Sequence, residues 1–441
     1  MRRYAPLLAA VVWAVSVPLV WWWGRWLQDQ DEVLLLGGAP PFAGLRITEA
    51  GWGTLAAVGV AALVLWRGPR LARTLRWGVL LAVGWATALA WTLALGASVR
   101  WSDLTEPLTN ENDYLPAVPG ASADPSGFLA TLQSDPMSYP VHVRGHPPGF
   151  TLLLAGMDRV GLGGAGWAAA LVILAGTSAV VAVALTIRLL GGAAGERTAR
   201  AAMPAVVLAP SAIWVATSAD AFYAGVLAWG TALLAVGTTS RGRARWAAVV
   251  GAGLLLGWAP FLSYGLLHMG LVVLAVPIVT RRWWPTVVAG LLVVATLVAW
   301  GLAGFWLWDG IAATHEAWSN GKASARPYGY FLVADIVLLG ALIGPAGVGG
   351  TARWRRLDPA TAWLAALAIV AAAAGAFGGF ERGEVERVWL PLACWIVPVA
   401  GALALGTGTG ERPGDGRTWR WWLGAQAATA IAIETLVVTP W

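Results

Sequence analysis

The amino-acid sequence predicts an all-α polytopic membrane protein that crosses the bilayer with about 13 helices. Of its 441 residues, 58% are hydrophobic and only 12% are charged, and its mean hydropathy is +0.67. Soluble domains contain roughly 25% charged residues, so this composition excludes a soluble class. The apolar runs match the roughly 20 residues that a helix needs to cross a bilayer, where every backbone group must pair internally.

Apolar runs of this length recur along the whole chain. They lie at 5–24, 50–66, 77–97, 166–188, 199–217, 220–238, 246–262, 264–280, 284–306, 330–348, 360–377, 387–405 and 420–438. The first run continues into Trp21-Trp22-Trp23 without a small-residue cleavage site, which favours a membrane helix over a signal peptide. We predict a transmembrane hairpin over 1–76, and a transmembrane core over 77–441 with a long outer loop at 98–148.

A further apolar stretch, 149–162, is too short to cross a bilayer and contains Asp158 and Arg159. We expect it to be interfacial or re-entrant. With the N-terminus in the cytoplasm, most of the 29 basic residues then fall on the inner side, as the positive-inside rule requires. These residues are Arg2, Arg3, Arg67, Arg70, Arg73, Arg76, Arg188, Arg197, Arg200, Arg241, Arg243, Arg245, Arg281, Arg282, Arg353, Arg355, Arg356, Arg412, Arg417 and Arg420. The predicted location is the plasma (inner) membrane, with the site on the extracytoplasmic face.

Several function classes lack support in the sequence. The sequence pI is near 10, but the arginines are spread over many short loops, a pattern of membrane topology and not of a nucleic-acid surface. No phosphate-binding GxxxxGK[ST] motif is present, so ATP-driven transport has no support. His142-x3-His146 has helical spacing, but Pro147 follows and no cysteine or second pair joins it. We therefore predict no metal site and no required cofactor; a divalent metal has no support.

Two segments of the 98–148 loop contain polar residues that are suited to catalysis or binding. Glu111 and Asp113 lie in the 98–148 loop, where a carboxylate near a substrate hydroxyl is able to act as a general base. The alternative is that Asp113, which precedes Tyr114, caps a short helix or stays solvated. In the second segment, His146 precedes Pro147-Pro148, a pair that starts helices well. The alternative there is a rigid turn with His146 as a structural hydrogen-bonding group.

Later outer segments add an aspartate and a group of cations. Asp220 lies at a tight turn between two apolar runs, where it either caps the next helix or points into a cavity. Between Phe380 and Pro391, Arg382 and Arg387 have the planar donor fork that suits a lipid phosphate, or they pair with the neighbouring glutamates. The candidates for binding a substrate that carries such a phosphate are Arg144, His146, Lys322, Arg326, Arg382 and Arg387. His315 is a further site candidate.

The order of these motifs resembles that of the GT-C membrane glycosyltransferases, particularly the branch of protein mannosyltransferases and aminoarabinose transferases. An acidic outer loop precedes His146-Pro147-Pro148, a later turn runs from Pro210 to Ala221, and Arg387-Val388-Trp389-Leu390-Pro391 opens a late helix. The resemblance covers roughly 77–441. It implies a polyprenyl-phosphate-linked sugar as donor, used at the outer membrane face without ATP.

The resemblance also implies roles for individual residues. Asp113 matches the acidic residue that acts as base in the family, with Glu111 as its neighbour; Arg382 or Arg387 would hold the departing phosphate. The family keeps a contiguous Asp-Glu pair, whereas this chain has Glu111-Asn112-Asp113-Tyr114, so either carboxylate fits the role. The hairpin at 1–76 is additional to the family pattern.

The expected reaction is inverting transfer of a hexose or pentose to a cell-envelope acceptor, which is a glycan, a lipoglycan or a protein. The Ala/Gly/Arg/Trp-rich, lysine-poor composition is typical of a GC-rich bacterial genome. Alternatives are a lipid or sugar transporter or flippase, a non-catalytic membrane scaffold, and a lipid-linked oligosaccharide ligase or polymerase. A transporter predicts charged residues at mid-membrane positions, and the predicted helix centres contain few.

Overall fold

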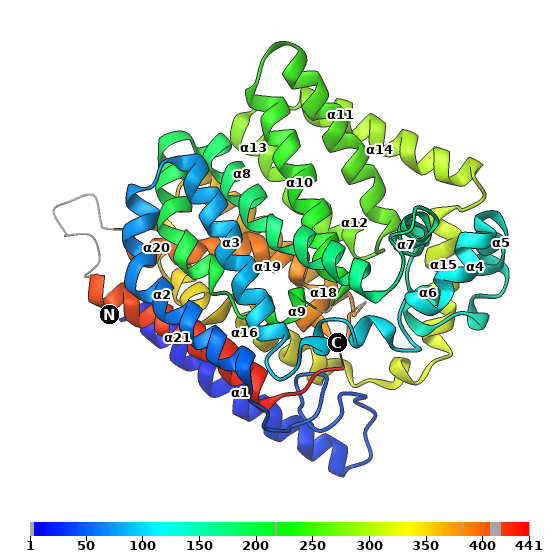
Figure 1. Cartoon of the computed structure of the whole chain (residues 1–441), viewed down its shortest axis with the longest axis horizontal. Helices are drawn as coiled ribbons and strands as arrows, with labels where there is room; N and C mark the ends of the chain where they lie inside the picture. The colour runs from blue at the N-terminus through cyan, green and yellow to red at the C-terminus, as the bar shows by residue number, and fades with distance from the viewer. Residues whose placement is uncertain (1–3, 217, 380, 406–415, 441) are drawn as a thin grey trace.

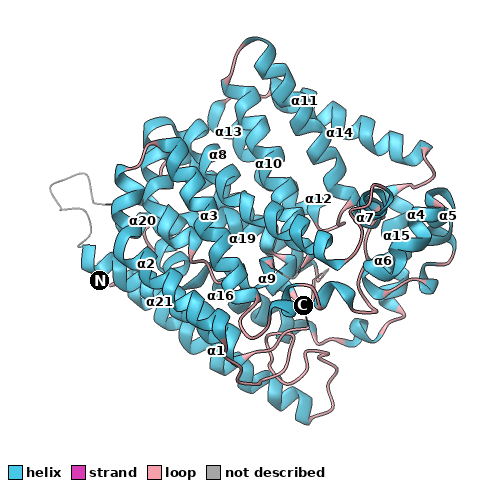
Figure 2. Ribbon diagram, viewed as in Figure 1, coloured by secondary structure: helices cyan, strands magenta, loops and turns pink. Residues whose placement is uncertain are grey.

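The computed structural model describes residues 4–216, 218–379, 381–405 and 416–440. Helices joined by loops make up this part of the chain, as Figures 1 and 2 show. Helix α1 (Ala5–Asp29) packs along α16 (Tyr328–Thr351), and α2 (Trp52–Thr74) packs against three other helices. Those helices are α3 (Trp77–Gly96), α8 (Ala165–Val207) and α21 (Gly416–Leu436). The predicted N-terminal hairpin is thus part of the helical bundle.

Short helices fill the predicted outer loop. They are η1 (Trp101–Leu104), η2 (Pro107–Thr109), η3 (Leu115–Ala117), α4 (Val118–Ala123), α5 (Pro125–Ser134), η4 (Pro136–Ser138) and α6 (Val141–Gly145). Helix α7 (Gly149–Arg159) follows Pro147 and Pro148. Its 11 residues extend about 16 Å, roughly half of a bilayer core. The structure therefore agrees with a non-spanning helix at 149–162.

Helix α8 contains the predicted span 166–188 and the first part of the predicted span 199–217. Its backbone turns at Gly192, where φ is 57° and ψ is −137°, a combination that favours glycine. The chain then continues through α9 (Ala212–Val215) into α10 (Ala219–Thr239). Nearly every residue of α10 is buried, and this helix packs between α8 and α11 (Gly242–Trp258).

Two segments predicted as single helices are broken in the structure. Residues 264–280 form α12 (Leu266–Met269), η6 (Gly270–Leu274) and α13 (Ala275–Thr280), after η5 (Ala259–Phe261). Residues 387–405 form the end of α18 (Val385–Val388), then α19 (Leu390–Ile396), η9 (Val397–Ala400) and α20 (Gly401–Ala404). Pro391 and Pro398 lie where these pieces start, because proline lacks the N–H that a continuous helix needs.

The remaining elements complete the bundle. They are α14 (Trp284–Leu302), α15 (Leu307–Ser319), η7 (Lys322–Ala325), η8 (Trp354–Arg356) and α17 (Pro359–Gly378). Among the described residues, nine helices are long and apolar enough to cross a membrane, and Leu266–Thr280 and Leu390–Ala404 are shorter apolar segments. The number 13 therefore stays a prediction.

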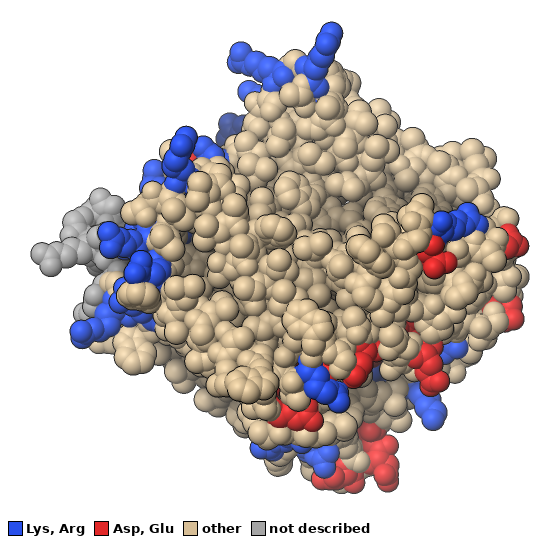
Figure 3. Space-filling model, viewed as in Figure 1, with Lys and Arg blue, Asp and Glu red and all other residues tan. Residues whose placement is uncertain are grey.

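Charge is divided between two sides of the molecule. Figure 3 shows acidic side chains on the side that carries α4, α5, α6 and α15, while the opposite side exposes mainly Lys and Arg. Near the C-terminus, Val438 pairs through its backbone with Leu45, in the loop between α1 and α2. The loops that were predicted to be outer, the loop after α1 and the end of α21 thus lie at one end of the bundle, and this end contains the candidate site.

Candidate active site

Asp113 lies at the end of a tight turn in the outer loop. Its backbone N–H donates to the carbonyl of Asn110 at 3.0 Å, and its Oδ1 accepts from the backbone N–H of Tyr114 at 2.6 Å. Only 8% of Asp113 is exposed. Tyr114 is buried beside it and accepts at its hydroxyl from the hydroxyl of Tyr223 in α10, at 3.0 Å. The turn is therefore attached to the most buried helix of the bundle.

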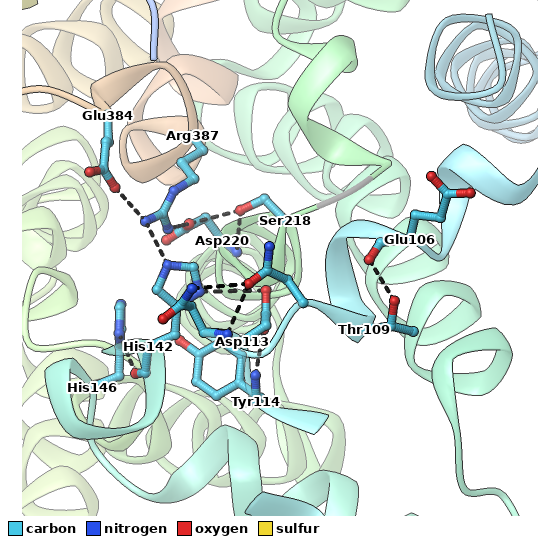
Figure 4. Close-up of polar contacts among 12 residues, drawn as sticks. Glu106, Thr109, Asp113, Tyr114, His142, His146, Ser218, Asp220, Glu384 and Arg387 are labelled. Carbon is cyan, nitrogen blue, oxygen red and sulfur yellow. Dashed lines mark hydrogen bonds and ion pairs between the residues drawn. The ribbon is translucent and has the colours of Figure 1, made fainter. Parts of the chain in front are cut away.

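His142 links Asp113 to Arg387. Its Nδ1 lies 3.4 Å from Oδ2 of Asp113, and its Nε2 lies 3.4 Å from Nη2 of Arg387. An arginine has donors only, so Nε2 of His142 must be the acceptor and its ring proton must lie on Nδ1. His142 thus presents an N–H to the Asp113 carboxylate. Figure 4 shows the imidazole between the two side chains.

Arg387 is the centre of this cluster. Its Nη1 donates to Oδ2 of Asp220 at 2.8 Å, and its Nη2 donates to Oε2 of Glu384 at 2.8 Å. Only 7% of Arg387 and 3% of Asp220 are exposed. Burial opposes the charge of Arg387, but Asp220 and Glu384 outweigh burial and raise its pKa.

Asp220 reaches Arg387 from the first turn of α10. The N-cap of this helix is Ser218, whose Oγ accepts from the backbone N–H of Asp220 at 3.1 Å and whose hydroxyl donates to Oδ2 of Asp220 at 2.8 Å. Of the two predictions for Asp220, the one in which it caps this helix is therefore wrong. Its carboxylate points to the cluster from a position where the helix N-terminus also favours negative charge.

Glu384 joins Arg387 to the loop after α1. Its backbone is left-handed, with φ of 63°, a conformation rare for residues other than glycine. The second oxygen of Glu384 accepts from Nη2 of Arg326 at 3.1 Å. Burial alone would raise the pKa of Glu384, but Arg387 and Arg326 hold it at about 2. Arg326 also donates to the carbonyls of Leu34 and Leu35, so this loop is attached to the site.

His146 lies beside the cluster as a neutral side chain. Its Nδ1 is 2.9 Å from the carbonyl of His142, which accepts and so places the proton on Nδ1. Burial lowers the pKa of His146 to about 4, although the nearby Asp220 acts in the opposite direction. The ring is edge-on to Tyr114 and tilted against Tyr223. This agrees with the reading of a structural hydrogen-bonding residue ahead of Pro147-Pro148.

Other predicted site residues lie outside the cluster. No hydrogen bond or ion pair within the described ranges connects the side chain of Glu111, Arg144 or Lys322 to Asp113 or Arg387. Glu111 and Lys322 are exposed. The same is true of His315, which stacks on Trp318.

Arg382 contacts the segment that contains Ser324 and Arg326, just before α16. Its Nη1 donates to the carbonyls of Ser324 and Arg326, and its guanidinium lies 5.2 Å from the ring centre of Trp318 and 5.7 Å from that of Tyr328. Arg382 and Arg326 are thus held by protein groups. Their predicted contact with a phosphate stays a prediction.

One partner in the cluster was not predicted as such, because His142 was considered only as a metal ligand. The Glu384–Arg387 ion pair agrees with the alternative in which the arginines pair with the neighbouring glutamates. The spacing of Glu384 and Arg387 is i,i+3, which places both on one face of a helical turn and was a usable signal for their ion pair. No comparable signal exists for His142 and Arg387, which are 245 positions apart.

A second buried polar group lies near Asp220. Oε2 of Glu381 accepts from the indole N–H of Trp389, and Oε1 lies 3.6 Å from Nε2 of His268 in α12. Burial, with a smaller effect of Asp220, raises the pKa of Glu381 to about 7, against which the Trp389 hydrogen bond acts. Glu381 therefore holds a proton near neutral pH, in contrast to Glu384.

Metal-ligand geometry is absent from the part of the chain that the structure describes. Within it, no group of three or more His, Cys, Asp or Glu side chains is placed to hold a metal ion. The prediction that no metal or cofactor is required stays a prediction.

The solved structures that are similar to this one include two of ArnT from Cupriavidus metallidurans. In the apo state, the TM-score is 0.44 at 17% identity, covering 81% of this chain and 78% of ArnT. ArnT bound to undecaprenyl phosphate gives a TM-score of 0.49 at 18% identity, covering 82% and 76%. No family model and no curated protein sequence matches the chain. ArnT is a GT-C aminoarabinose transferase.

Proposed function

We propose that this protein is a membrane glycosyltransferase that moves a sugar from a polyprenyl-phosphate donor to a hydroxyl group of a cell-envelope acceptor. The observation that carries the proposal is the buried chain Asp113–His142–Arg387–Asp220 at the polar end of a membrane helix bundle. It combines a positioned carboxylate with a positioned cation, the two groups that such a transfer requires. The ordered motifs from Asp113 to Pro391 support the same reaction.

In this mechanism, Asp113 is the general base. The acceptor oxygen forms a bond to the anomeric carbon while the bond from that carbon to the phosphate oxygen breaks. The proton of the acceptor hydroxyl passes to Asp113, and the electron pair leaves with the lipid phosphate. Phosphate is a good leaving group, so no strong acid is needed. A single displacement of this kind inverts the configuration of the sugar.

His142 is a positioning residue for this base. With its proton on Nδ1, its N–H lies on the side of Asp113, and its Nδ1 is 3.4 Å from Oδ2 of that carboxylate. Oδ1 is held by the backbone N–H of Tyr114, so both oxygens have defined partners. A proton acceptor held in this way needs no rearrangement when the acceptor hydroxyl arrives.

Arg387 is the buried cation that we propose for binding the donor phosphate. It already binds two carboxylates, those of Asp220 and Glu384. Arg387 would have to exchange part of its contact with Asp220 or Glu384 for the phosphate. Glu384 retains Arg326 as a second partner, whereas Asp220 retains only the Ser218 hydroxyl among the contacts described here. Breaking the Arg387–Glu384 contact therefore costs less free energy than breaking the Arg387–Asp220 contact. Arg144 and Lys322, on the same side, are further phosphate-binding candidates.

The segregation of charge supports the proposed topology of 13 spans with a cytoplasmic N-terminus. The arginine-rich side would face the cytoplasm and the side with Asp113 the extracytoplasmic space, following the positive-inside rule. The proposed location is the plasma membrane of a bacterium. Partners would be the lipid-linked donor, membrane lipids, and a glycan, lipoglycan or protein acceptor, without nucleic acid.

The decisive experiment compares two variants of the outer loop. Asp113→Asn keeps the shape of the side chain and removes the proton acceptor, so turnover of a polyprenyl-phosphate sugar should fall by about 10²–10⁴-fold. Glu111→Gln, at an exposed position two residues away, is the matched control and should retain most activity. Donor binding by both purified variants should equal that of the wild type.

Three outcomes would change the conclusion. If Glu111→Gln is the inactive variant, Glu111 is the base. If both variants transfer sugar normally, the proposal of an enzyme fails and a scaffold becomes the better explanation. If the wild type moves the intact lipid-linked donor from one leaflet of a vesicle membrane to the other and transfers no sugar, the protein is a flippase.

A further inference from the structure

An apolar groove lies on the arginine-rich side of the bundle, away from Asp113. It has a volume of about 360 Å³ and opens between α2, α3 and α8. Its lining residues are Leu63, Val64, Trp66, Arg67, Gly68, Leu71, Ala72, Leu80, Val83, Gly84, Thr87, Met203, Pro204 and Val207. Arg67 is the only charged residue in this lining, and Thr87 adds a hydroxyl that is already bonded to the carbonyl of Val83. The walls are therefore suited to a hydrocarbon chain.

Two glycines leave space for this groove. A Cβ at Gly84 would lie 2.8 Å from Sδ of Met203, and a Cβ at Gly68 would lie 3.0 Å from Val64 and 3.6 Å from Pro204. Because neither position has a side chain, residues of α8 form the floor between α2 and α3. The groove is thus formed by packing of three helices and does not result from one flexible side chain.

A cluster of arginines lies at one end of the groove. Arg67, Arg70, Arg73 and Arg76 are all exposed, and none forms an ion pair with a carboxylate of the described ranges. Arg67 stacks on Trp66, with 3.8 Å between its guanidinium carbon and the ring centre. Arg70 follows Arg67 by three residues in α2, so both lie on the same face of the helix.

Glu196 is the acidic residue near this end of the groove, and two other arginines already compensate its negative charge. Glu196 accepts from Arg188 at 2.9 Å and from Arg200 at 2.7 Å. Arg200 also donates to the carbonyls of Ala72 and Leu75 and so closes the C-terminal end of α2. The positive charge of Arg67 and Arg70 therefore remains available to a ligand with negative charge.

We propose that the groove between α2, α3 and α8 binds an anionic phospholipid of the cytoplasmic leaflet. One acyl chain would lie along the apolar lining, and the headgroup phosphate would contact Arg67 and Arg70. Arginine clusters directly cytoplasmic of a membrane helix, and basic pockets between helices, bind anionic lipid headgroups. The site is separate from the proposed sugar transfer and uses only the orientation of the bundle.

The test is competition between two lipids for the delipidated full-length protein. Equimolar phosphatidylglycerol and phosphatidylcholine with identical acyl chains are added in detergent, and bound lipid is counted by native mass spectrometry. The wild type should bind phosphatidylglycerol in preference. The double variant Arg67→Ala/Arg70→Ala should lose this preference, with affinity reduced about fivefold for each arginine removed.

Two further variants separate the groove from general charge attraction. Arg241→Ala/Arg243→Ala removes two exposed arginines at the N-terminal end of α11 on the same side and should retain the preference. Thr87→Trp fills the groove from a half-buried position in its lining and should reduce bound phosphatidylglycerol while all arginines remain.

Three results would overturn the proposal. They are equal binding of both lipids by the wild type, equal loss in the two double-arginine variants, and unchanged binding in Thr87→Trp. If polyprenyl phosphate displaces phosphatidylglycerol with the same dependence on Arg67, the occupant is a prenyl lipid and the proposed ligand is wrong.

Discussion

Arg387 has N–H donors only, and it contacts acceptors on Asp220, Glu384 and His142. This one side chain therefore lowers the pKa of Glu384, together with Arg326, and sets the tautomer of the imidazole that faces Asp113. Removing one partner of such a buried pair leaves an uncompensated charge, which costs about 3–5 kcal/mol. The proposed base thus depends on contacts that lie two side chains away from it.

Glu381 differs from Glu384 although both belong to the same short segment. Two arginines contact Glu384, whereas Glu381 has an indole N–H and a histidine nearby. Burial dominates at Glu381 and raises its pKa from 4.5 to about 7. Ion pairs dominate at Glu384 and hold its pKa at about 2. A carboxylate able to lose its proton near pH 7 costs stability when it ionises.

The pH dependence of stability tests this difference. The folded-state pKa of Glu381 is raised, so the folded protein binds more protons than the unfolded chain between about pH 4.5 and 7. Stability should fall as pH rises through this window, by on the order of 3 kcal/mol from this group. Glu381→Gln keeps an acceptor for Trp389, so its apparent Tm should fall less between these pH values.

Thermal unfolding of the purified protein in detergent at several pH values measures this effect. Glu316→Gln, at an exposed position in α15, is the control and should follow the wild-type curve. Parallel curves for wild type and Glu381→Gln would show that Glu381 does not gain a proton on folding.

At the scale of elements, glycine and proline decide where helices end. Apolar runs predict a helix wherever they are long enough, but Pro391 and Pro398 start new short pieces within 387–405. The turn in α8 occurs at Gly192, between the two spans predicted there. The breaks matter for function because Glu384 and Arg387 lie in the irregular segment that precedes α19.

The Gly192 turn makes a specific prediction. No heavy atom would lie within 4 Å of a Cβ at this position, so Gly192→Ala tests backbone conformation alone. An alanine with φ of 57° and ψ of −137° should destabilise the protein by about 1–3 kcal/mol. The apparent Tm in detergent should fall accordingly.

Gly290→Ala is the matched control. Gly290 lies inside α14, is exposed, and also has open space around a Cβ. Its backbone is helical, so alanine should raise stability there by up to about 1 kcal/mol. A similar gain for Gly192→Ala would contradict the left-handed turn in α8.

At the scale of the whole molecule, the N-terminal hairpin is part of the site region. Arg326 donates to the carbonyls of Leu34 and Leu35, and the backbone N–H of Ala43 donates to Oε1 of Glu386 at 2.8 Å. Phe42 stacks on Trp214 with 6.1 Å between ring centres. The loop after α1 therefore covers the segment that carries Arg387, although the sequence resemblance begins only after this hairpin.

The orientation of the whole molecule is testable by labelling. In a variant without Cys394, single cysteines at positions 70, 243 and 355 should resist a membrane-impermeant thiol reagent in intact cells. Cysteines at positions 124 and 320 should react. After permeabilisation all five should be labelled, which controls for exposure. Reaction of position 243 in intact cells would contradict the proposed topology.

The sequence by itself determined the membrane class and the approximate positions of most of the helices, and it predicted that Asp113, His146, Asp220 and Arg387 lie on one side. These features depend on local composition, on the length of apolar runs and on charge in short loops, all of which are properties of neighbouring residues. The short helix α7 is also among the features that the sequence predicts, because the apolar stretch 149–162 is too short to cross the bilayer.

Only the tertiary structure decided which of these side chains meet. His142 and Arg387 come from segments 245 positions apart, and Arg326 reaches Leu34 across 292 positions. Contacts of this kind depend on how helices pack and on where Gly192 and the prolines redirect the chain. A sequence pattern records which residues are polar, whereas their partners, burial and protonation depend on the fold around them.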